Sequence, residues 1–107
     1  MLAKQHLTHG RVLVTFRLPP DVKAERVHVV GDFNAWSTVA HPMVRDADGL
    51  VTEVELEAGR RYRFRYLLDG DRWANDWAAD DYITNHFGGD DSVIDLTTVD
   101  RSTEHAT

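Results

Sequence analysis

The chain has 107 residues, an apolar fraction of 42% and a formal net charge of −6. This is the length of one domain, and the composition argues against global disorder. An acidic surface repels nucleic-acid phosphates and anionic lipids, so we expect neither nucleic acid nor a membrane as a partner. The absence of cysteine excludes disulfides and thiolate metal sites and is typical of a cytoplasmic protein. No signal peptide or membrane-spanning run is expected from the sequence.

The two ends of the chain are polar and show no clear period. We expect a flexible lead-in at residues 1–10 and a flexible tail at residues 98–107. The folded domain is therefore predicted at residues 11–97.

Alternation of apolar and polar residues predicts β-strands along this domain. Five segments carry the pattern: 11–18, 26–30, 50–56, 62–68 and 92–96. A turn composition at residues 46–49 predicts a hairpin that joins a short extended piece to the third strand. The fourth strand gives the strongest signal, with Phe64 and Tyr66 assigned to the core and Arg65 to the opposite face. Short strands without a long helical period predict an antiparallel β-sandwich.

Two tryptophans each follow a predicted strand through a polar turn. Trp36 follows the second strand, and Trp73 lies just past the Asp-Gly turn after the fourth. A sugar site needs flat aromatic rings for stacking and polar groups that orient the hydroxyls, and Arg65 supplies such a group. An isolated tryptophan is usually buried, so pattern alone leaves a core and a surface role equally open.

Several other residues are expected to have structural roles. Trp77 is predicted to pin the long polar loop at residues 74–89 to the sandwich. Arg63 is predicted to pair with Glu53 or Glu55 across a hairpin. The aspartates of the long loop look solvated and are not expected to be catalytic. The six histidines lack metal-ligand spacing, so no metal and no cofactor is expected.

Three motifs in order resemble a known family. Residues 31–36 (Gly-Asp-Phe-Asn-Ala-Trp) resemble the Gly-x-Phe-Asn-x-Trp motif of the family 48 carbohydrate-binding modules. These modules are also the N-terminal early-set domains of isoamylases and the glycogen-binding domains of AMP-activated kinase β subunits. Residues 62–73 and 85–96 are similar to the family's later strand-and-turn and closing segments. The resemblance covers roughly residues 11–96.

The resemblance implies an early-set, immunoglobulin-like sandwich that binds α-1,4-glucans such as glycogen or starch without catalysis. By motif position it assigns stacking to Trp36 and Trp73, and hydrogen bonding to Arg65. It assigns the residue that packs through the curved glucan to Phe87, and the orienting polar residue to Asp91. The alternative is a protein-interaction module that docks a partner or a second copy with little sugar binding.

Overall fold

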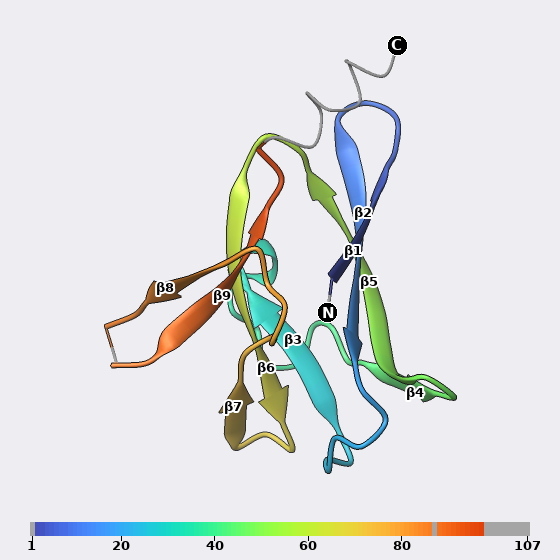
Figure 1. The fold of residues 1–107 in the computed structure, drawn as a ribbon, viewed down its shortest axis with the longest axis vertical. Coiled ribbons are helices and arrows are strands. Elements are labelled where there is room, and N and C mark those ends of the chain that lie inside the picture. Colours follow the sequence, from blue (N-terminus) through green and yellow to red (C-terminus); the bar gives the residue numbers. More distant parts are fainter. Residues whose placement is uncertain (1, 87, 98–107) are drawn as a thin grey trace.

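Two antiparallel sheets pack face to face in the computed structural model, which describes residues 2–86 and 88–97 (Figure 1). The first sheet has the order β1 (Leu2–His6), β2 (Arg11–Leu18), β5 (Gly49–Glu57), β4 (Val44–Asp46). The second has the order β3 (Val27–Gly31), β6 (Arg61–Leu68), β9 (Asp90–Asp95), β8 (Asp81–Thr84), with β7 (Arg72–Ala74) also paired to β6. The predicted antiparallel, immunoglobulin-like β-sandwich is therefore confirmed, and the predicted strands agree with the observed ones to within about two residues.

The core lies between the sheets and is built from the alternate residues of their strands. In β2 the even-numbered residues from Val12 to Leu18 are buried, and in β6 Tyr62, Phe64 and Tyr66 are buried. Phe16 meets Phe64 edge-on across the two sheets, with ring centroids 5.1 Å apart. Burial of each large apolar side chain stabilises the fold by about 1.5–3 kcal/mol.

The hairpin predicted around residues 46–49 is present. Strand β4 pairs with β5, with Asp46 opposite Gly49. Gly49 has φ +130°, and a Cβ atom there would lie 1.9 Å from the carbonyl oxygen of Leu18. The turn therefore requires glycine at this position.

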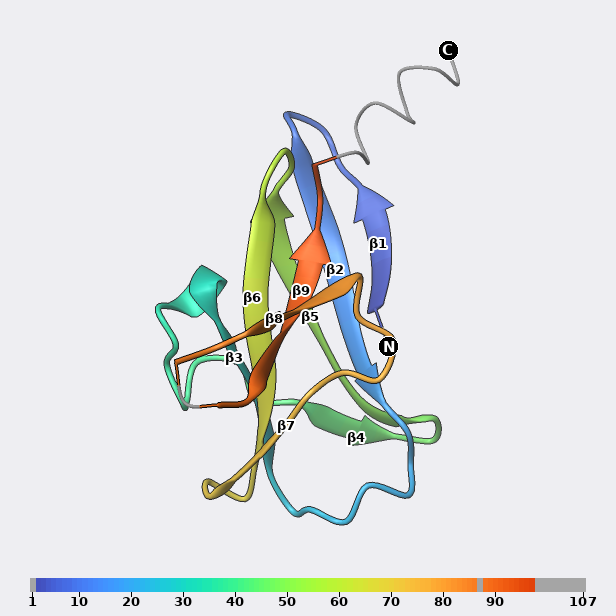
Figure 2. The same cartoon turned by 60° about the vertical axis from the view of Figure 1, so that its left-hand side comes forward.

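Residues 2–6 form strand β1, where the sequence suggested a lead-in without regular structure. β1 runs beside β2 at the edge of the first sheet, with Leu2 opposite Phe16 (Figure 2). Backbone pairing and the half-buried Leu2 order this segment, although its side chains are mostly polar. The predicted C-terminal tail, residues 98–107, lies outside the described residues.

The long loop predicted at residues 74–89 contains strand β8, and its anchor is not the one predicted. Trp77 is 56% exposed, so the prediction that it pins the loop is wrong. The anchor is the neighbouring Asp76, which is 1% exposed and accepts a hydrogen bond of 2.5 Å from the hydroxyl of Tyr66. Its backbone N–H also donates to Ser92 Oγ at 3.0 Å. A buried carboxylate with these partners fixes the loop more firmly than an exposed ring can.

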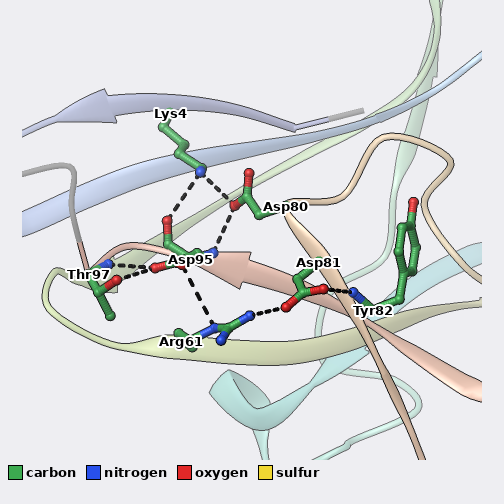
Figure 3. Close-up of polar contacts among 7 residues, drawn as sticks. All are labelled: Lys4, Arg61, Asp80, Asp81, Tyr82, Asp95 and Thr97. Atoms are coloured by element: carbon green, nitrogen blue, oxygen red, sulfur yellow. Dashed lines mark hydrogen bonds and ion pairs between the residues drawn. The ribbon is translucent and has the colours of Figure 1, made fainter.

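Charged side chains connect the edge strand of the first sheet to the second sheet (Figure 3). Lys4 Nζ on β1 lies 2.6 Å from Asp80 Oδ2 and 3.2 Å from the carbonyl oxygen of Asp95. Arg61 donates to Asp81 at 2.6 Å, and this hydrogen bond lowers the pKa of the Asp81 carboxyl. The cluster holds β1, β8 and β9 together at one end of the sandwich.

Candidate functional site

An open hollow of about 690 Å³ lies on the outer face of the second sheet. Because Phe64 and Tyr66 point into the core, Arg63 and Arg65 of the same strand point outward. Eight residues line the hollow: Asp32, Trp36, Arg63, Arg65, Trp73, Asn85, His86 and Asp91. Four of the five predicted site residues are thus brought together, and the fifth, Phe87, lies outside the described residues.

A strained turn presents Trp36 at the end of β3. After Gly31 the chain forms the 3-10 turn η1 (Asp32–Asn34), and then Ala35 and Trp36 both take left-handed backbone conformations, with φ 55° and 58°. The backbone N–H of Trp36 donates to the carbonyl of Gly31 at 2.9 Å and closes the turn. Such conformations are costly for non-glycine residues and persist where the surroundings fix them. Trp36 remains 36% exposed, so its ring is available on the surface.

The carboxylate of Asp32 joins this turn to the central strand β6. Its Oδ1 atom accepts a hydrogen bond of 2.9 Å from the indole Nε1–H of Trp36. Its Oδ2 atom accepts one of 2.8 Å from the backbone N–H of Arg63. Sequence reasoning placed Asp32 only in a turn, and its bond to Arg63 spans 31 positions of the chain, so no local pattern could reveal it.

Trp73 and Arg65 form a second wall of the hollow. Trp73 lies on β7 opposite Leu67 of β6 and is 44% exposed. The guanidinium carbon of Arg65 lies 5.6 Å from the centroid of the Trp73 ring, within the range of a cation–π contact. Arg65 therefore lies over one face of the Trp73 ring.

Arg65 retains hydrogen-bonding capacity. Its Nε atom is buried and has no hydrogen-bond partner. Among the non-exposed side chains that the structure describes, it is the one buried nitrogen or oxygen atom without a partner. A guanidinium carries five N–H donors and no acceptor. Because Arg65 lines the hollow, its guanidinium suits a ligand that presents oxygen acceptors.

Asp91 lines the hollow and is only 6% exposed. It accepts a hydrogen bond of 3.1 Å from Asn85 Nδ2 and lies 3.8 Å from Arg63 Nη1. The predicted pairing of Arg63 with Glu53 or Glu55 is wrong, because β5 belongs to the other sheet. Arg63 and Asn85 are thus additional residues of the site, and both reach it through long-range pairing of β6, β8 and β9.

Several polar groups of the hollow already have partners within the protein. The oxygens of Asp32 and Asp91 already face donors from Trp36, Arg63 and Asn85. Exposed indole rings and guanidinium donors remain. Rings stack on apolar C–H faces, and guanidinium groups bind hydroxyl oxygens, so the surface has the chemistry that a sugar chain requires.

Over residues 2–86 and 88–97, no group of three or more His, Asp or Glu side chains is arranged to hold a metal ion. Within the same residues, no helix has the length and apolar character needed to cross a membrane.

The fold and the hollow define a β-sandwich binding module with an aromatic surface. The chain belongs to the family carbohydrate-binding module 48 (isoamylase N-terminal domain), whose family model matches residues 21–83, more than half of the chain. The resemblance drawn from the sequence motifs is thereby confirmed. No curated protein matches the chain. The match includes Trp36, Arg65 and Trp73 and ends before Asn85 and Asp91.

Membership in this family supports binding of carbohydrate in general, and the family consists of non-catalytic binding modules.

Proposed function

We propose that the chain binds α-1,4-glucan, such as glycogen, starch or a maltooligosaccharide, on the hollow of the second sheet and does not catalyse its turnover. The observation that carries the proposal is the position of two exposed tryptophans and the guanidinium of Arg65 around one hollow. Family membership supports carbohydrate as the class of ligand, and the geometry of the hollow supports this surface as the place where it binds.

In this proposal each residue has a distinct role. Trp36 and Trp73 stack on the apolar faces of glucose rings, and Arg65 donates to hydroxyl oxygens. Phe87, to which the resemblance assigns the apolar residue that reaches through the curved glucan, packs against the sugar. Asp91 acts mainly by holding Asn85 and Arg63, since its carboxylate is almost buried.

An exposed hollow immobilises a flexible ligand and buries little area. We expect dissociation constants on the order of micromolar to millimolar. The direct test is a titration with maltoheptaose that follows tryptophan fluorescence and NMR chemical shifts. Cellohexaose, which has the same sugar in β-linkage, serves as the ligand control.

The three tryptophans of the chain supply a matched set of variants. Trp36→Ala and Trp73→Ala should each weaken maltoheptaose binding about tenfold or more, since each removes a stacking ring. Trp77→Ala should have no effect, because Trp77 is 56% exposed and does not line the hollow. Equal affinity in all three variants, or no binding by the natural chain, would refute the proposal.

The competing function is a protein-interaction module on the same scaffold. Size-exclusion chromatography with and without maltoheptaose separates the two functions. A dimer that is unchanged by the sugar, in a chain that shows no chemical-shift response to maltoheptaose, would favour the interaction module.

A further inference from the structure

The carboxylate of Asp32 has an unusual position among the residues of the hollow, because it contacts one of the proposed stacking rings and the strand beneath it. One oxygen accepts from Trp36 Nε1–H at 2.9 Å and the other accepts from the backbone N–H of Arg63 at 2.8 Å. The second bond fixes the carboxylate to β6, which lies between β3 and β9 in the second sheet. The first bond then fixes the indole to the carboxylate.

The bond to Asp32 is the hydrogen bond that orients the Trp36 side chain in the part of the chain that the structure describes. The turn that carries it has two consecutive left-handed residues, and Trp36 is 36% exposed. An exposed aromatic side chain rotates among several rotamers, and ordering it on ligand binding costs free energy. A charge-assisted hydrogen bond to a fixed carboxylate removes this freedom before the ligand arrives.

We propose that Asp32 is a positioning residue that presets the plane of the Trp36 indole for stacking. This inference rests on the proposed function and adds a residue to it. Its chemical consequence is that the Trp36 N–H bonds to the protein, so Trp36 offers the ligand its ring face and no hydrogen bond. Asp32 acts through Trp36 and makes no required contact with the sugar.

A double-mutant cycle tests this coupling. Asp32→Ala removes both hydrogen bonds, so it should weaken maltoheptaose binding about three- to tenfold and lower the melting temperature by several degrees while the protein stays folded. The affinity of Asp32→Asn for maltoheptaose should lie between those of the natural chain and Asp32→Ala. The asparagine oxygen can accept from only one of the two N–H groups, and its NH₂ group faces the other. Asp21→Ala, which removes an exposed aspartate that does not line the hollow, is the matched charge control and should bind like the natural chain.

The decisive variant is Asp32→Ala in a Trp36→Phe background. Phenylalanine has no indole N–H, so loss of Asp32 should then cause no further loss of affinity. The same fold-change in both backgrounds would mean that Asp32 contacts the sugar, acts by charge or acts through its bond to the backbone N–H of Arg63, and would overturn the inference.

Exchange of indole protons with water gives a readout that does not depend on sugar. In the natural chain the Trp36 Nε1–H should exchange more slowly than that of Trp77, and Asp32→Ala should abolish the difference. Equal exchange in the natural chain would overturn the inference even if the sugar binds. If the sugar does not bind, the proposed function fails, and the effect of Asp32 on affinity fails with it. Normal binding with no effect of Asp32→Ala overturns the inference alone.

Discussion

The guanidinium of Arg65 lies over the indole of Trp73, with Cζ 5.6 Å from the ring centroid. Strand β6 supplies the cation and β7 supplies the ring, and the two strands pair directly. The contact orients the planar fork of Arg65 and leaves its buried Nε without a partner. An arginine held in this way presents donors at fixed positions, which a flexible ammonium cannot do.

Arg65→Lys should therefore weaken maltoheptaose binding although the charge is retained. We expect a loss of about three- to tenfold, since lysine loses the fork and most of the ring contact. Arg60→Lys is the matched control, because Arg60 stacks on Tyr62 at 5.2 Å and does not line the hollow. NMR titration of both variants is the measurement. If Arg65→Lys binds as tightly as the natural chain, only the charge of this residue matters.

Gly31→Ala should destabilise the fold by about 1–3 kcal/mol in urea unfolding. The backbone of Gly31 is extended, with φ −170°, so the cause is steric: a Cβ atom would lie 2.4 Å from the carbonyl oxygen of Arg63. Gly70→Ala gives the contrast, because Gly70 has open space but φ +78° and should lose only about 1 kcal/mol through backbone strain. A Gly31→Ala protein that is as stable as the natural chain would show that the turn before Trp36 can shift without cost.

The buried Tyr66 predicts loss of stability at alkaline pH. Burial, and then the charge and hydrogen bond of Asp76, raise the pKa of the Tyr66 hydroxyl well above its ordinary value. A tyrosine in the unfolded chain ionises near pH 10, whereas folded Tyr66 keeps its proton. Its contribution to the unfolding free energy is therefore complete below about pH 10 and is lost as the pH rises beyond that value. Urea unfolding between pH 8 and 11 should show this decline.

Tyr66→Phe provides the control for that decline. The variant should lose about 1–3 kcal/mol at neutral pH, because the Asp76 carboxylate loses the hydroxyl that donates to it. Its stability should then fall less steeply above pH 10 than that of the natural chain. Identical alkaline slopes would exclude Tyr66 as the titrating group.

Acid pH should weaken the cluster of Figure 3. The hydrogen bond from Arg61 holds the pKa of Asp81 below its usual value, near 4 in the unfolded chain. Stability from this pair is therefore present above about pH 4 and is lost as the pH falls through the lower pKa of the folded state. Asp81→Asn should make thermal stability less dependent on pH between 2 and 4, and Asp21→Asn should not. Because the pair is exposed, its effect at neutral pH should be small and reduced by salt.

The sequence predicted the parts of the fold in which periodicity and burial coincide. Strand β2 has the predicted bounds because its alternate residues are all buried, and β6 was identified by its aromatic face. Strands β1 and β8 lie at the edges of their sheets and carry mostly polar side chains, so apolar alternation does not mark them. These two strands form because their backbones pair with β2 and β9, and a local sequence pattern does not reveal such pairing.

Only part of the candidate site was predicted, because some of its residues are brought there by tertiary pairing. The pattern placed Trp36 and Trp73 in turns after strands and Arg65 on an outward strand face, and the family resemblance then assigned all three to one surface, which the structure brings together. Asp32 and Asn85 entered the site through hydrogen bonds that depend on tertiary pairing. The role of Trp77 was mistaken because tryptophan is usually buried and aspartate usually exposed, whereas Asp76 and Trp77 reverse this preference.

Strand β6 sets the spacing between the two tryptophan-bearing segments. Gly31, which precedes the Trp36 turn, pairs with Phe64, and Trp73 pairs with Leu67, three residues further along β6. Insertions in the surface turns would leave this interval of about 10 Å unchanged. A single residue inserted into β6 directly after Phe64 would instead exchange the two faces of the strand beyond that point, turning Arg65 inward and Tyr66 outward. The length of this segment of β6 thus determines the spacing between the two tryptophans. Changes in the loops could alter the affinity of the surface, whereas a longer strand segment would disrupt it.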